Sequence, residues 1–188
     1  MRYEGTRDGI EYHALAATGG GLGHDLPKAG FLHHMDVVTV RKNRFTVAAL
    51  PIGAVIDPKT FDATRYDAIT RLLQGKGEQI MAFLPKTLQA QTVAQFSIEL
   101  SNPTDRPVEF TTEFTGLPKG LTITPDHEHV ALAPAGRKRL RFKCLSGKTT
   151  TKSKTIRLRV HTDYLARDTR VSLPIRTYKV IKAEAKKK

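Results

Sequence analysis

The chain of 188 residues contains no tryptophan, a single cysteine and no long apolar run. A helix that crosses a membrane needs about 20 consecutive apolar residues, so the sequence predicts no membrane span. One cysteine excludes an internal disulfide. Because Cys144 alternates with basic residues in a strand-like run, we interpret it as a small buried residue rather than as a nucleophile.

The start of the chain also lacks the pattern of an export signal. Residues 1–8 contain no basic segment that leads into an apolar stretch, which a secretory signal would have. We therefore expect a cytoplasmic protein, or an extracellular one if the sequence is a mature or excised fragment. With 39% apolar and 26% charged residues, the composition favours a folded chain with a packed core.

Acidic residues are scarce in the last part of the chain. Residues 136–188 hold 18 lysines and arginines but 3 acidic residues, whereas residues 1–90 hold 11 and 9, and residues 91–135 hold 2 and 6. The net charge of +13 is therefore a local property of the C-terminal part. Such a concentration indicates either a surface for an anionic partner or a solvated face that keeps the protein soluble.

Two strand-like runs, residues 139–144 and 156–161, carry much of this charge as an alternation of basic and apolar residues. Because successive side chains of a strand point to opposite faces, each run has an apolar face and a basic face. We interpret the runs as an antiparallel pair joined by a basic loop. A single sequence does not determine strand pairing, so the alternative is that the two runs belong to different sheets. The predicted partner-binding residues are Arg139, Arg141, Lys143, Lys148, Lys152, Lys154, Arg157 and Arg159.

Short alternating segments fill the second half of the chain, separated by turns rich in proline and glycine. Besides the two basic runs, strands are predicted over residues 93–100, 108–114, 121–124, 129–133 and 171–180. Strands of this length and spacing are typical of a β-sandwich. The sequence therefore predicts a mainly β protein with a C-terminal seven-stranded immunoglobulin-like sandwich.

Residues 90–180 resemble a bacterial immunoglobulin-like module, similar to the hydin-like and major-sperm-protein-like group and to modules appended to secreted hydrolases. The resemblance lies in an N-x-T turn at Asn102–Thr104, a GLPKGLTI corner at 116–123, an LAPAG turn at 132–136 and the segments VHTD and VSLPI. It implies a scaffold, spacer or adhesive unit, and no catalytic residue carries over from it.

A smaller α+β segment, a hairpin followed by one helix, is predicted before the sandwich. Met35–Val40 and Phe45–Leu50 flank a polar turn, which indicates the hairpin. Tyr66, Ile69, Leu72 and Leu73 share one face of the helix. Thr64 and Asp67 have the spacing of a capping box at its start, and the helix should end before Gly75.

The remaining segments show less periodicity. A second short helical turn is expected over residues 78–84. The predicted organisation is an extended or flexible arm at 1–34, the hairpin and helix at 35–88, the sandwich at 89–181 and a basic tail at 182–188.

One cluster has residue types that bind metals, namely His24, Asp25, His33, His34 and Asp36. Imidazole and carboxylate groups are ligands of zinc and iron. However, the adjacent His33 and His34 would point to opposite faces of a strand, and no cysteine lies nearby. We therefore expect no metal site.

No other pattern indicates catalysis or a cofactor. The glycine-rich stretch 19–23 lacks the lysine followed by serine or threonine that would hold a phosphate. Acidic residues such as Asp57, Asp62 and Asp67 fit turns and a helix start rather than a cleft with two carboxylates. We expect a protein that is not an enzyme and binds no cofactor.

These observations favour a non-catalytic structural or assembly subunit. It would dock to protein partners, or to further copies of itself, through the N-terminal arm and the basic sheet face. The alternatives are a polyanion-binding module for nucleic acid or acidic polysaccharide, and the accessory C-terminal part of a glycan-active hydrolase. Because the basic face carries no aromatic side chain that could stack on bases, electrostatic docking is favoured over nucleic-acid recognition. An acidic polysaccharide, an anionic lipid surface and an acidic protein subunit fit this face equally.

Overall fold

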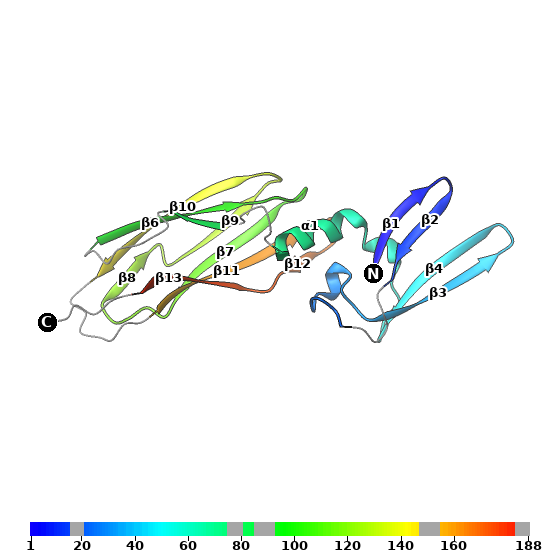
Figure 1. Ribbon diagram of the computed structural model, residues 1–188, viewed down its shortest axis with the longest axis horizontal. Helices are drawn as coiled ribbons and strands as arrows, with labels where there is room; N and C mark the ends of the chain where they lie inside the picture. Colours follow the sequence, from blue (N-terminus) through cyan, green and yellow to red (C-terminus); the bar gives the residue numbers. More distant parts are fainter. Residues whose placement is uncertain (16–20, 75–80, 85–92, 147–154, 183–188) are drawn as a thin grey trace. The chain divides into compact units, whose positions relative to one another are not determined.

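The computed structural model describes residues 1–15, 21–74, 81–84, 93–146 and 155–182, and it is mainly β (Figure 1). The chain divides into two compact units, Met1–Thr70 and Arg71–Lys188. The boundary falls within the helix α1 (Ala63–Gln74). None of the helices in the described ranges combines the length and the apolar character needed to cross a bilayer.

The first unit contains two antiparallel hairpins and two short 3₁₀ helices (Figure 1). The predicted hairpin is confirmed, because β3 pairs with β4 along its whole length up to a two-residue turn. The predicted arm at residues 1–34 holds a hairpin of its own, which the weak periodicity did not indicate. The elements are β1 (Arg2–Arg7), β2 (Ile10–Ala14), η1 (Pro27–Ala29), β3 (His34–Arg41), β4 (Arg44–Pro51) and η2 (Pro58–Thr60).

A small core holds the first unit together. Met1, Leu32, Ala49 and Phe61 are buried against one another, and Ile56 packs at the edge of this cluster. Gly30 lies beside it with φ at +87°, and a Cβ there would come within 2.6 Å of the Met1 carbonyl oxygen. The close approach of two backbone segments therefore requires glycine at this position.

Helix α1 confirms the predicted helix and corrects its start. The side chain of Asp62 accepts a hydrogen bond from the Arg65 backbone N–H at 2.7 Å, so Asp62 is the N-cap. Thr64, the predicted cap, is exposed and already helical. Ile69 and Leu72 are buried, as the 3.6-residue period predicted.

The second unit is a β-sandwich of two antiparallel sheets. One sheet has the strand order β5–β6–β10–β8, and the other has the order β12–β11–β7–β9, with β13 also paired to β11. The strands are β5 (Met81–Leu84), β6 (Val93–Ser101), β7 (Val108–Thr115), β8 (Leu121–Thr124), β9 (His127–Leu132), β10 (Arg137–Ser146), β11 (Thr155–Leu165), β12 (Arg170–Ser172) and β13 (Arg176–Lys182).

Three aromatic rings join the two sheets. Phe96 on β6 stacks on Phe142 of β10 with ring centroids 5.3 Å apart, and Phe114 of β7 meets both rings edge-on from the other sheet. Pairs of this geometry add to the stability gained from burial alone. Cys144 is buried in the same interior, as predicted, and burial raises the pKa of its thiol.

The structure corrects three details of the predicted sandwich. Nine strands are described rather than seven, because residues 81–84 form β5 instead of a helical turn and the predicted strand 171–180 is split into β12 and β13. The most consequential correction is that β10 and β11 do not pair. Strands β6 and β8 occupy the two edges of β10, while β7, β12 and β13 pair with β11.

Candidate functional site

The predicted basic residues lie on two outward faces, one on each sheet. Within β10, Leu140, Phe142 and Cys144 are buried while the alternate positions are exposed, so the predicted alternation is correct. On β11 the buried Ile156, Leu158 and Val160 alternate with the exposed Arg157 and with the half-buried Arg159 and His161. Because the two strands belong to different sheets, Arg139, Arg141 and Lys143 lie on one face, and Arg157 and Arg159 lie on the other. Lys148, Lys152 and Lys154 lie outside the described residues.

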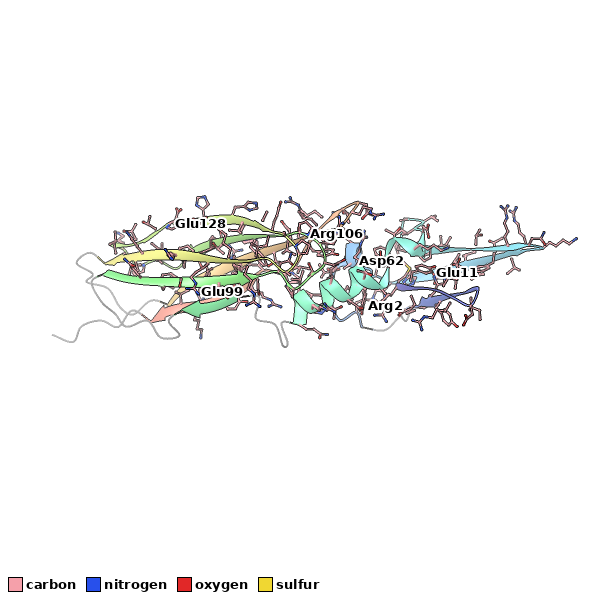
Figure 2. All side chains as sticks on the ribbon, turned by 90° about the horizontal axis from the view of Figure 1, so that it is seen from above. Arg2, Glu11, Asp62, Glu99, Arg106 and Glu128 are labelled. Carbon is pink, nitrogen blue, oxygen red and sulfur yellow. The ribbon has the colours of Figure 1, made fainter. Side chains whose placement is uncertain are left out.

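The outward face of β6, β10 and β8 is strongly basic; we call it the β10 face. Four cations follow one another at alternate positions of β10, against a single carboxylate, Glu99 of β6 (labelled in Figure 2). Glu99 lies 3.2 Å from Arg139 and 4.0 Å from Arg137. Arg141 and Lys143 form no ion pair with any described residue. The four cations are Arg137, Arg139, Arg141 and Lys143.

The cross-strand neighbours of Arg141 and Lys143 are uncharged. Arg141 lies opposite Ser97, and Lys143 lies between Gln95 and Thr124. Alternate side chains on a strand are about 7 Å apart, which is less than the Debye length of about 8 Å at physiological ionic strength. The charges of neighbouring cations therefore reinforce one another at the surface.

The outward face of the other sheet, the β11 face, has a similar number of cations but far more carboxylates. Arg159 and His161 both contact Glu113, and Arg170 lies 2.7 Å from Glu109. Arg157 lies opposite Lys179, and neither forms an ion pair with a described residue. The described charges are four cations (Arg157, Arg159, Arg170 and Lys179) against three carboxylates (Glu109, Glu113 and Asp163). The β11 face is therefore close to neutral.

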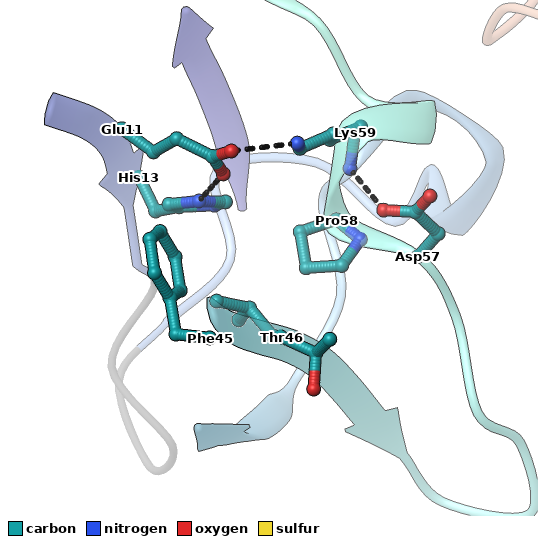
Figure 3. Close-up of a pocket in the computed structure, with 8 residues that line it drawn as sticks. Glu11, His13, Phe45, Thr46, Asp57, Pro58 and Lys59 are labelled. Carbon is teal, nitrogen blue, oxygen red and sulfur yellow. Dashed lines mark hydrogen bonds and ion pairs between the residues drawn. The ribbon is translucent and has the colours of Figure 1, made fainter. Parts of the chain in front are cut away.

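Sequence reasoning missed a cleft in the first unit, because it lies in segments with little periodicity. The cavity of about 190 Å³ is lined by Glu11, His13, Phe45, Thr46, Val47, Asp57, Pro58 and Lys59 (Figure 3). Glu11 accepts a hydrogen bond from Lys59 Nζ at 2.8 Å, and this bond lowers the pKa of Glu11 and raises that of Lys59. The wall formed by β2 and η2 is thus fixed by a charged pair.

The histidine cluster does not assemble as a metal site. His33 is exposed and His34 is buried, as their adjacent positions in an extended segment predicted. His34 Nδ1 lies 3.0 Å from the Leu32 carbonyl oxygen, and Nε2 lies 3.8 Å from Asp36. Within the ranges that the structure describes, no three histidine, cysteine or acidic side chains converge as a metal would require.

No model of a known protein family matches the chain, and no curated protein matches it. Among solved structures, it is similar to WR4, a member of the MSP family from C. elegans, with 12% identity over 55% of this chain and 98% of that one, and a TM-score of 0.36. It is also similar to SSP-19, an MSP-domain-like protein from Caenorhabditis elegans, with 18% identity over 42% of this chain and 66%, just under two thirds, of that one, and a TM-score of 0.32.

A third similar structure is the ASH or PapD-like domain 7 of human CEP192, with 12% identity over 56% of this chain and 87% of that one, and a TM-score of 0.30. At these identities and scores, the three likenesses carry no argument about function, and the description of the sandwich rests on its strand pairing. The bacterial and hydrolase-appended parts of the predicted resemblance stay predictions.

Proposed function

We propose that the protein is a non-catalytic interaction module whose sandwich docks through the β10 face onto an acidic surface of a partner protein. The observation that carries this proposal is the contrast between the two sheets. Among the described residues, the β10 face carries four cations and one carboxylate, whereas the β11 face carries four cations and three carboxylates. A solubilising role alone would not require the charge to gather on one face.

The size of the site favours a protein over a nucleic acid. Glu99 already neutralises part of the charge of Arg137 and Arg139, so Arg141 and Lys143 are the unpaired cations among the described residues of this face. Proteins that bind duplex DNA by charge typically contact about 6–10 phosphates. In addition, the outward positions of the described β6, β8 and β10 residues contain no aromatic side chain, so bases would find no stacking partner. The charge of two unpaired cations on a sheet face is matched by two or three carboxylates on the surface of a partner protein.

The proposal is tested by the salt dependence of binding to three labelled probes, namely poly-L-glutamate, heparin and duplex DNA. Fluorescence anisotropy of each probe with the whole chain is followed between about 50 and 200 mM salt. We expect poly-L-glutamate to bind most tightly and to weaken as salt rises. Duplex DNA should give a slope of log K against log salt near −1.8, about 0.9 for each of two phosphates.

Two results would overturn the proposal. Binding of poly-L-glutamate that ignores salt would exclude electrostatic docking. A DNA slope corresponding to six or more phosphates, together with tighter binding of DNA or heparin than of poly-L-glutamate, would favour the polyanion-binding alternative. Turnover of a glycan by the chain would instead favour the hydrolase alternative, for which the described residues supply no supporting observation.

A further inference from the structure

The hairpin β3–β4 exposes apolar side chains on both of its faces. Val38, Val40 and Phe45 on one face are 57%, 77% and 45% exposed, and Met35 and Val37 on the other are 61% and 44% exposed. Side chains that lie opposite each other in the register share a face, so Val38 stands beside Val47, and Val40 beside Phe45. Exposed apolar residues gathered on one two-stranded element indicate a binding surface rather than scattered exposure.

The outer edge of β4 is ready to accept another strand. Ala49 exchanges two hydrogen bonds with Ile56, from Ala49 N to Ile56 O at 2.9 Å and from Ile56 N to Ala49 O at 2.8 Å. The backbone groups of Ala49 therefore point away from β3. Because this direction alternates with a period of two residues, the N–H and C=O groups of Val47 and Phe45 point to the same side.

Within the described part of the chain, these outward groups have no hydrogen-bond partner. No described residue forms a hydrogen bond to the backbone of Val47 or Phe45 on this side. The Ala49–Ile56 bridge is thus the first step of a ladder that stops after one residue pair, because the chain then turns into η2 at Pro58. An exposed edge of this kind is a template for an added strand.

The cleft described above lies along this edge (Figure 3). Phe45 and Val47 of β4 form one wall, and Glu11, His13 and Lys59 form the other. Residues of β2 and of β4 thus line the same cleft within the first unit. The bond between Glu11 and Lys59 joins β2 to η2 on the second wall and offers a charged pair to a segment that enters the cleft.

The charges at the tip of the hairpin decide which segment fits. Arg41, Lys42 and Arg44 are exposed there, and the described part of the hairpin carries one carboxylate, Asp36, near its base. A strand added antiparallel to β4, in the direction of Ile56, would have its C-terminal end beside this basic tip. A second copy of β4 added in this direction would bring no carboxylate to the basic tip, because β4 (Arg44–Pro51) contains no acidic residue.

We propose that β4 binds an extended segment of a partner protein by β-strand addition, with apolar side chains against Val47 and Phe45 and acidic residues at the C-terminal end of the segment. Main-chain hydrogen bonds provide the affinity, and the cleft and the basic tip determine which side chains the bound segment carries. This site is independent of the β10 face, so either can fail in experiment without the other.

The test uses a synthetic peptide of about eight residues, the length of an ordinary strand. Valine alternates with threonine in its N-terminal half, aspartates follow in its C-terminal half, and a fluorophore reports binding to the whole chain by anisotropy. Val47→Pro removes an N–H that points outward, whereas Val38→Pro, its partner in the register, removes the equivalent N–H on the opposite edge. We expect V47P to weaken binding about tenfold or more and V38P to change it less than about threefold.

A second set of measurements keeps the wild-type chain intact. Peptides methylated on the backbone nitrogen at even or at odd positions are compared, and one of the two sets should lose binding because only alternate N–H groups face β4. The Arg157→Glu/Lys179→Glu variant, which alters the β11 face, should bind the unmethylated peptide as the wild type does.

The outcomes that would overturn the proposal are equally specific. Equal loss from V47P and V38P, or equal loss from both methylated peptides, would exclude pairing with β4. Light scattering that shows a dimer abolished by V47P would assign the edge to a second copy of the chain. Binding to vesicles of anionic lipid that survives V47P, with no binding of the peptide, would assign the apolar hairpin to a membrane surface.

Discussion

Asn102 is the residue on which the turn between β6 and β7 depends. Its side chain is 1% exposed. Nδ2 donates to the carbonyl oxygens of Arg106, Leu132 and Ala133 at 2.8–3.0 Å, and Oδ1 accepts from the backbone N–H and the hydroxyl of Thr104. One amide therefore links its own turn to the end of β9. The N-x-T pattern predicted a turn at this position, but the sequence did not predict its contacts with Leu132 and Ala133, which lie 30 and 31 residues away.

Replacing Asn102 with alanine should destabilise the protein by about 3 kcal/mol, because buried carbonyl and N–H groups would lose their partners. The free energy of unfolding is measured by urea denaturation followed by circular dichroism. Asn43→Ala, the same substitution at an exposed turn, should change it by less than about 0.5 kcal/mol. Equal effects from the two variants would show that the Asn102 contacts contribute little.

At the scale of elements, the α1 helix shows why a capping residue is hard to locate from sequence. Thr64 and Asp67 fit the spacing of a capping box, but Thr60 and Asp62 are also residue types that cap helices. In the structure the chain becomes helical one residue after Asp62, and Asp62 accepts the bond from the Arg65 N–H. Tyr3 also pairs with this segment, since its N–H donates to the Phe61 carbonyl oxygen at 2.8 Å. This tertiary contact, which local sequence does not reveal, places the helix start.

Asp62→Ala should therefore lower the free energy of unfolding by about 1 kcal/mol, the usual effect of losing an N-cap. Thr64→Ala should leave it within about 0.5 kcal/mol, because Thr64 is an exposed helical residue and alanine is a good helix former. Thermal denaturation of the two variants, monitored by circular dichroism, provides the comparison. A larger loss from Thr64→Ala would restore the capping box that the sequence predicted.

Most strands of the sandwich were predictable, but their partners were not. The two-residue period around Leu140, Phe142 and Leu158 identified which side chains are buried, because a strand with one buried face must alternate. Pairing depends on which strand edges are already occupied, and that is a property of the whole sheet. The basic runs therefore looked like one hairpin although they belong to two sheets. The cleft in the first unit was not predicted, because Glu11 and Lys59 lie 48 residues apart in segments without a clear period.

At the scale of the molecule, the net charge of +13 is distributed unevenly over the sandwich. On the β11 face the cations pair with Glu109, Glu113 and Asp163. On the β10 face, Glu99 is the one carboxylate among the described residues. Charge complementarity governs the rate and selectivity of docking more than its strength. We therefore propose docking to an acidic partner for one face of the sandwich, and strand addition for the first unit.

The assignment to one face is tested most directly by a matched charge reversal. Arg141→Glu/Lys143→Glu and Arg157→Glu/Lys179→Glu replace the same number of exposed cations, the first pair on the β10 face and the second on the β11 face. Affinity for poly-L-glutamate at physiological salt is measured for both variants and the wild type, after circular dichroism has shown that all three are folded. The account predicts a loss of about tenfold or more for the first variant and of less than about threefold for the second. Equal losses, or a greater loss from the second variant, would contradict it.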